Sequence, residues 1–272
     1  MRRLPVAAVV LAACKPGLPA PTVAPTPTPP AAVLYHPGTA SYQLVQHRHV
    51  EQLVQGQPLT TDVETRILLT VSLVPRDTGL AATFVIDSIA VEGGPGFPAE
   101  AAVAARGAQL SGTLLPGGAL TPLQVADTTN PVLQQIVFLL QDFFPGTPRA
   151  GATAGARWID TTDEHGTSGA VDFRLRSVNT RTSSAWTTFA GAQALEILTD
   201  AMIEISGTGA QAGQEFTLAG AGHGHGRHYL VIDGRLIGGS RADTVTMAVE
   251  LTGTGITIPV SQRTADTLRI AS

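Results

Sequence analysis

Apolar and polar side chains alternate along much of the chain. Val171, Phe173 and Leu175 are separated by charged residues, and the alternation recurs over 244–251 and, less regularly, over 67–73. Successive side chains of a strand point to opposite faces, so this pattern predicts strands with one face on a core and the other in water. Such strands are typical of antiparallel sheets. We count roughly ten of them and little strand–helix–strand alternation, which argues against a parallel sheet.

Turn-forming residues separate these alternating segments. Glycine and proline cluster where the alternation stops, as expected for tight connections between antiparallel strands. Residues 110–125 are interpreted as a hairpin around one such turn. The predicted turns are centred on Pro116-Gly117-Gly118, Asp233-Gly234, Gly238-Gly239 and 253–255.

One helix is predicted, over residues 131–144. Asn130 is a suitable N-cap, Pro131 fits the first turn, and Pro145 ends the helix. Its apolar side chains recur at helical spacing, which favours packing against the sheet; a mobile lid and a membrane-touching segment are the alternatives. Residues 192–206 fit either a helix or a strand.

The amino terminus has the pattern of an export signal. Arg2 and Arg3 precede an apolar run of about ten residues, which as a helix rises about 15 Å, half of a hydrocarbon core of about 30 Å. The sequence Leu11-Ala12-Ala13-Cys14 then resembles the lipobox of bacterial lipoproteins. The resemblance implies removal of residues 1–13 and acylation of Cys14. The alternative is an ordinary signal peptide with a chance cysteine.

A proline-rich segment follows the cysteine. Residues 14–33 lack an apolar pattern that could build a core, and proline at this density favours an extended tether of roughly 55 Å. The remaining residues, 34–272, are predicted to form a single domain. Lys15 directly follows the acylated position, and by resemblance to proteobacterial sorting this favours the outer membrane.

Together, these features resemble those of a known group of lipoproteins. A lipobox, a proline-rich tether, a long antiparallel meander and one apolar helix look like the layout of LolA/LolB-like or mycobacterial LppX-like lipoproteins. The resemblance implies a strongly curved half-barrel or open barrel with the helix in its concave side and a hollow that binds acyl chains. It transfers no site residue.

Composition excludes several classes of function. The chain has 17 basic and 21 acidic residues and no basic cluster, which argues against nucleic acid binding. Cys14 is the only cysteine, so the domain has neither a disulfide nor a thiolate site. After the signal, no apolar stretch reaches the length of a membrane span.

The best candidate for metal chemistry is a histidine-rich segment. His223, His225 and His228 could bind zinc or copper, but on a strand His228 would point away from the other two. Only a loop would gather all three, and the simpler interpretation is a polar, glycine-rich hairpin loop without metal. His47 and His49 share one strand face and could lie beside this segment.

Candidates for catalysis are weaker still. Asp160, Asp163, Glu164 and His165 could hold calcium or transfer protons, although an exposed turn explains them better. The sequence contains no Gly-x-Ser-x-Gly or His-Glu-x-x-His motif. We therefore expect no catalytic residue, metal or cofactor.

The sequence favours a non-catalytic envelope lipoprotein that binds or carries an apolar ligand. The alternatives are a structural or interaction lipoprotein and a metal-binding lipoprotein that uses His223 to His228. A hollow beneath the sheet would favour the carrier, and a filled core would favour the structural role.

Overall fold

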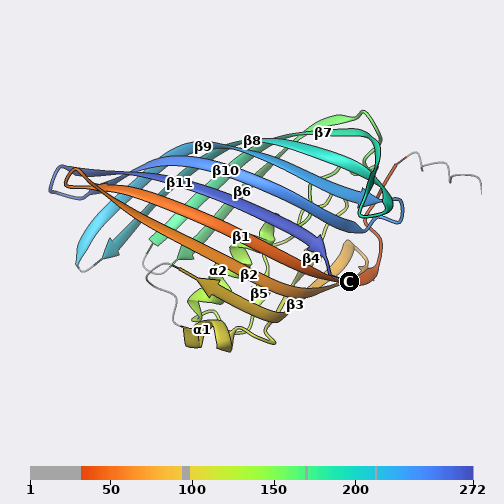
Figure 1. Cartoon of the computed structure of the whole chain (residues 1–272), viewed down its shortest axis with the longest axis horizontal. Helices are drawn as coiled ribbons and strands as arrows, with labels where there is room; N and C mark the ends of the chain where they lie inside the picture. Colours follow the sequence, from red (N-terminus) through yellow and green to blue (C-terminus); the bar gives the residue numbers. More distant parts are fainter. Residues whose placement is uncertain (1–31, 94–98, 169–170, 212, 272) are drawn as a thin grey trace, which may run out of the picture.

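The computed structural model describes residues 32–93, 99–168, 171–211 and 213–271, which form one antiparallel sheet of eleven strands and two helices. Figure 1 shows the long strands side by side in a curved sheet with both helices on the same side. The predicted signal, Cys14 and nearly all of the tether lie outside the described residues. In order, the elements are β1 (Gly38–Val54), β2 (Gln57–Arg76), β3 (Gly79–Glu92), α1 (Ala99–Ala104), β4 (Gln109–Leu114), β5 (Gln124–Val125), α2 (Pro131–Gln141), β6 (Arg157–Ser168), β7 (Val171–Phe189), β8 (Ala192–Gln211), β9 (Gln214–Val231), β10 (Leu236–Leu251) and β11 (Ile256–Ile270).

The first and last strands pair in the middle of the sheet. The strand order is β5-β4-β3-β2-β1-β11-β10-β9-β8-β7-β6, and the β1–β11 register runs from Tyr42 opposite Ile270 to Gln52 opposite Val260. Because β5 and β6 are the two edges and do not pair, the sheet is not closed into a barrel. The predicted mainly β, single antiparallel and open sheet is thus confirmed.

Alternation divides the two faces of the sheet as predicted. On β7, Phe173 and Leu175 face the concave side, while Arg174 and Arg176 lie on the exposed convex side. Convex carboxylates on the neighbouring strands pair with these arginines, including Glu204 at 3.2 Å from Arg176. Most of the convex side therefore faces water, and the main core lies in the hollow.

The helix α2 begins where the sequence predicted. The Asn130 side-chain oxygen accepts hydrogen bonds from the backbone N–H groups of Val132 (2.9 Å) and Leu133 (3.3 Å). The helix ends at Gln141, three residues before the predicted end, because Phe143 and Phe144 leave the helix to pack against Tyr42 and Phe84. None of the helices in the described residues is both long and apolar enough to cross a membrane.

The structure confirms one local prediction, decides a second and corrects a third. The hairpin around Pro116-Gly117-Gly118 is confirmed, since Leu110 of β4 pairs with Val125 of β5. Residues 192–206 belong to strand β8. The predicted turn at Gly238-Gly239 is wrong, because both residues lie inside β10, where their missing side chains make room for the rings of Phe189 and His228.

Glycine occupies four consecutive concave positions of β9. Gly220, Gly222, Gly224 and Gly226 alternate with side chains on the convex face. A Cβ atom at Gly220 would lie 2.5 Å from the Cβ of Met247, and one at Gly222 would lie 2.8 Å from the Cα of Val245. Glycine inside a strand commonly marks such a close approach or a bend. We call these four residues the glycine stripe. Because they lack side chains, side chains of β10 can extend over β9 on the concave face.

We expect Gly222→Ala to lower the free energy of unfolding by about 1–3 kcal/mol, because the added methyl group would overlap the β10 backbone. Gly226→Ala is the matched control: its Cβ would lie 3.5 Å from the Cβ of Thr199, an ordinary contact. The control should stay within about 0.5 kcal/mol of the wild type. Urea unfolding measures both, and equal midpoints for the two variants would contradict this account of the stripe.

Candidate ligand-binding cavity

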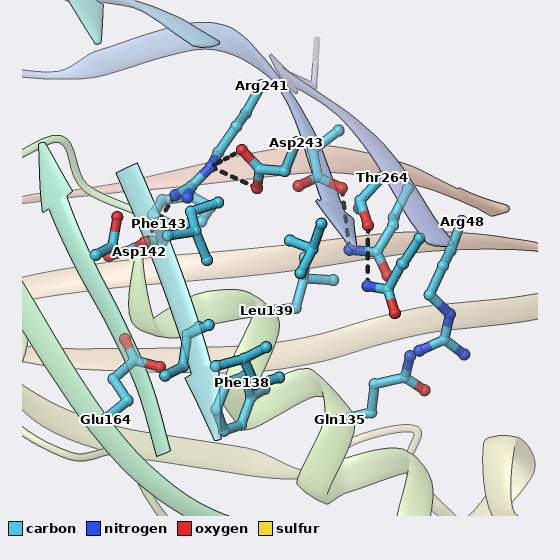
Figure 2. A pocket seen from close by; sticks show the side chains of 18 of the residues that line it. Arg48, Gln135, Phe138, Leu139, Asp142, Phe143, Glu164, Arg241, Asp243 and Thr264 are labelled. Carbon is cyan, nitrogen blue, oxygen red and sulfur yellow. Dashed lines mark hydrogen bonds and ion pairs between the residues drawn. The ribbon is translucent and has the colours of Figure 1, made fainter. Parts of the chain in front are cut away.

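A cavity of about 680 Å³ lies between α2 and the concave face of the sheet. One wall consists of α2 side chains and the residues that follow the helix, and the other comes from β1 and from β6 to β11. Figure 2 shows Phe138 and Leu139 of the helix pointing into this space opposite the strands. The buried face of α2 is turned away from the cavity and packs in the main core, which includes Ile67, Phe84 and Leu110.

One side of the cavity, lined by the residues around Phe173, Ile205 and Met247 of β7, β8 and β10, is apolar. Phe138 and Phe173 pack with ring centroids 4.7 Å apart and join the helix to β7. Ile205 and Met247 continue this surface across the sheet, on either side of the glycine stripe. The alternation of apolar residues that predicted these strands therefore also supplies the apolar wall.

The other side of the cavity is polar. Arg241 of β10 binds Asp142, the C-cap of α2, at 2.7 Å, and Asp243 of its own strand at 2.8 Å (Figure 2). Burial lowers the pKa of Arg241, but the two carboxylates together raise it above its ordinary value. Burial raises the pKa of Asp243 despite the arginine. The three side chains form a charged link between the end of the helix and the sheet.

The pKa values of two further carboxyl groups in the cavity are raised, which favours their protonated forms. Burial raises the pKa of Glu164 to about 8, and the nearby charge of Asp142 adds to the effect. Burial also raises the pKa of Asp266 to about 6, although a hydrogen bond donated by Gln46 at 3.0 Å opposes the shift. At neutral pH Glu164 is therefore mainly an uncharged hydrogen-bonding group.

The histidine-rich segment is part of strand β9, so the hairpin-loop interpretation is wrong. The alternating glycines, which suggested a loop, are the glycine stripe. As the alternation requires, His223 and His225 lie together on the convex face with ring centroids 5.9 Å apart, while His228 faces the cavity. Burial lowers the pKa of His228 to about 3, so its ring is neutral.

His47 and His49 also lie on the convex face, but not beside the β9 histidines. They are on β1, which β11 and β10 separate from β9. Each is paired with a carboxylate of β2, His47 with Glu64 at 3.1 Å and His49 with Asp62 at 2.7 Å. Across the described ranges, no group of three or more histidine, cysteine or acidic side chains is placed to hold a metal ion.

The acidic cluster after Trp158 is not an exposed turn, because it lies within strand β6. The alternation sends Asp160 and Glu164 inward and leaves Asp163 and His165 on the convex face. Asp160 binds the buried Arg181 at 2.6 Å. The four residues therefore do not form one site, and only Glu164 reaches the cavity.

Sequence reasoning missed the polar residues of the cavity, including Arg48, Asp142, Arg241 and Asp243. For the residues on strands, the signal is a charged residue where the alternation expects an apolar one: Asp243 lies two positions before Val245 on the concave face of β10. The position becomes informative only when the register of the strand is known.

Comparisons with known proteins show no family for this chain. No family model matches it, and no curated protein matches it. Among solved structures, it is similar to crystal structures of OccK2 (OpdF) from Pseudomonas aeruginosa, one of them in complex with glucuronate. For that complex the TM-score is 0.25 and the identity 8%, over 86% of this chain and 98% of the other. The second structure has a TM-score of 0.25 and 9% identity, over 85% and 98% of the two chains. A likeness of this extent supports no conclusion about the function of this chain.

The raised pKa of Glu164 predicts a loss of stability as pH rises. The folded protein binds a proton at Glu164 that the unfolded chain releases near its ordinary pKa of 4.5, so this contribution is complete below pH 4.5 and is lost toward pH 8. Glu164→Gln removes this dependence. Between pH 5 and 8.5 we expect the variant to gain on the order of 2 kcal/mol relative to the wild type.

Urea unfolding at a series of pH values tests this prediction. The difference between the unfolding free energies of variant and wild type removes the contribution of His228. Because the pKa of His228 is lowered, its contribution to stability increases as pH rises through the acidic range, opposite to that of Glu164. Glu204→Gln, on the exposed convex face of β8, is the control and should follow the wild-type curve. If the unfolding free energies of Glu164→Gln and the wild type changed in parallel with pH, Glu164 would not hold a proton in the folded state at neutral pH.

Proposed function

We propose that this protein is a lipid-anchored protein of the cell envelope whose domain binds an apolar ligand without catalysis. The observation that carries the proposal is the cavity of about 680 Å³ between α2 and the sheet, one side of which is lined by apolar residues of β7 to β10. Small-molecule sites typically have volumes of roughly 300–1,000 Å³ and are mostly apolar with a few polar groups. Both properties fit a ligand with a large apolar part.

The division of the apolar side chains of α2 between the core and the cavity favours ligand binding over a purely structural role. A structural domain gains most by filling its hollow with side chains, as α2 does where Val132, Ile136 and Leu140 pack in the main core. Phe138 and Leu139 of the same helix line the cavity and remain partly exposed. Apolar surface left in a concave space is a feature of ligand sites.

The apolar surface also extends beyond the cavity toward the strand ends. Val249 and Leu251 of β10 and Phe216 of β9 continue the concave face and are half-buried. Ile256, opposite Leu251 on β11, is 53% exposed. A chain-like ligand could therefore extend from the cavity along the inner face, which supports an acyl or similar chain as the apolar part.

Filling the cavity should prevent binding. In the full-length chain carrying Cys14→Ser, we expect Ile205→Trp to weaken binding of the neutral fluorescent probe N-phenylnaphthylamine by about tenfold or more, because the indole would occupy the apolar wall. Met202→Trp is the matched control, since Met202 is on the same strand but is 74% exposed on the convex face. Fluorescence titration gives the affinities. Absence of probe binding to the wild type, or equal loss in both variants, would favour the structural alternative.

The membrane anchor is proposed from the sequence and is tested separately. We expect the wild-type chain to incorporate a palmitate analogue and to sediment with membranes, whereas Cys14→Ser should remain unlabelled and leave the membrane fraction. Two or more acyl chains anchor stably, at about 0.8 kcal/mol per buried methylene, so the loss should be nearly complete. Metabolic labelling followed by membrane fractionation measures both effects. Labelling of Cys14→Ser at the wild-type level would disprove acylation at this residue, and separation of the membranes would test the outer-membrane location.

A further inference from the structure

Arg48 is a charged residue of the cavity with no charged partner. It lies on the concave face of β1, and its Nε atom is buried without a hydrogen-bond partner. In the described part of the chain, its guanidinium group has no ion pair within 4.0 Å. Burial alone lowers the pKa of Arg48, with no opposing contribution from a carboxylate. The cation is therefore partly desolvated without being neutralised by an ion pair.

The other two inward-facing arginines of the concave side are both paired. Arg241 binds Asp142 and Asp243, and Arg181 binds Asp160. Removing an ionised group from water is costly unless it is paired and hydrogen-bonded. The chain meets this requirement within its own structure at two positions, but not at Arg48.

The surroundings of Arg48 offer polar groups, and in the described residues no acidic side chain lies within ion-pair distance of it. Figure 2 shows Arg48 and Gln135 of α2 approaching the same corner of the cavity. Thr264 is opposite Arg48 on β11 and accepts a hydrogen bond from Gln262 at 3.3 Å. Asp266, farther along β11, is held by Gln46. This corner can accommodate an anionic group, and the apolar wall begins across the cavity at Phe138 and Met247.

We propose that the ligand is a long-chain amphiphile with one anionic headgroup, a carboxylate or a phosphate monoester, which binds the guanidinium group of Arg48. The tail lies along the apolar wall formed by Phe173, Ile205 and Met247. Arginine suits this role because its planar donors match the oxygens of carboxylates and phosphates in pairs. The inference rests on the proposed function and adds the chemical class of the ligand.

Three probes with the same tail separate the headgroup from the chain: dodecanoate, dodecyl phosphate and dodecanol. We expect the full-length chain with Cys14→Ser to bind at least one anionic probe about tenfold or more tightly than dodecanol in calorimetric titrations. Arg48→Met should weaken binding of that anion by about 10- to 100-fold, because a hydrogen bond to a charged group is lost, and should leave dodecanol binding unchanged. The stronger of the two anions identifies the headgroup as carboxylate or phosphate.

Arg263→Met is the matched control, because Arg263 is exposed on the convex face of β11 and its loss removes the same charge. It should leave the affinities for all three probes unchanged. Arg48→Lys keeps the charge but not the paired donors, and should retain part of the preference for the anion.

Different failures have different meanings. Equal wild-type affinities for the anions and dodecanol, or unchanged anion binding in Arg48→Met, would overturn the headgroup assignment and leave the apolar cavity proposal intact. If neither these probes nor N-phenylnaphthylamine bound, the proposed function itself would fail. Should Arg48→Met not fold, the three-probe comparison on the otherwise unaltered chain would decide the headgroup assignment.

Discussion

The architecture depends on one topological constraint: the two edges of the open sheet are consecutive in the chain. Because β1 pairs with β11 in the middle of the sheet, β5 and β6 lie at opposite edges, and residues 126–156 must connect them. This connection carries α2, whose apolar face is buried in the hollow. The helix fills the part of the hollow near β1 to β4, and the cavity is the space left between the helix and the inner faces of β1 and of β6 to β11.

Polar contacts at the carboxyl end of the helix attach the connection to the rest of the fold beside this cavity. Asp142 is linked to β10 through Arg241, the Tyr35 hydroxyl donates to the Pro145 carbonyl at 2.7 Å, and the Trp158 indole donates to the Gly146 carbonyl at 3.2 Å. These contacts bind the connection to three separate parts of the fold just after α2. Apolar packing positions the helix over the core, and the polar contacts hold the connection that follows it.

The sequence predicted the elements of this fold better than its cavity. Alternation and the Asn130 cap are local signals, and they located the strands and the start of α2. The β9 glycines look like a loop when only the chain neighbours are considered, and their role depends on β10, which packs across them. The pairing of Arg241 with Asp142 joins residues 99 positions apart. Such pairings follow from register and topology, which local patterns do not determine.

The polar groups on the concave face differ in whether they have interaction partners within the chain. Arg181, Asp160 and Arg241 have partners within the chain, so their burial is explained by the links they form. His228 lacks a partner at Nδ1, but its lowered pKa makes it neutral and reduces the cost of burying it. Arg48 cannot lower its cost in this way, because a guanidinium group remains charged in proteins. A folding explanation therefore accounts for Arg181, Asp160, Arg241 and His228 but not for Arg48, which is why we propose that a ligand contributes the missing charge there.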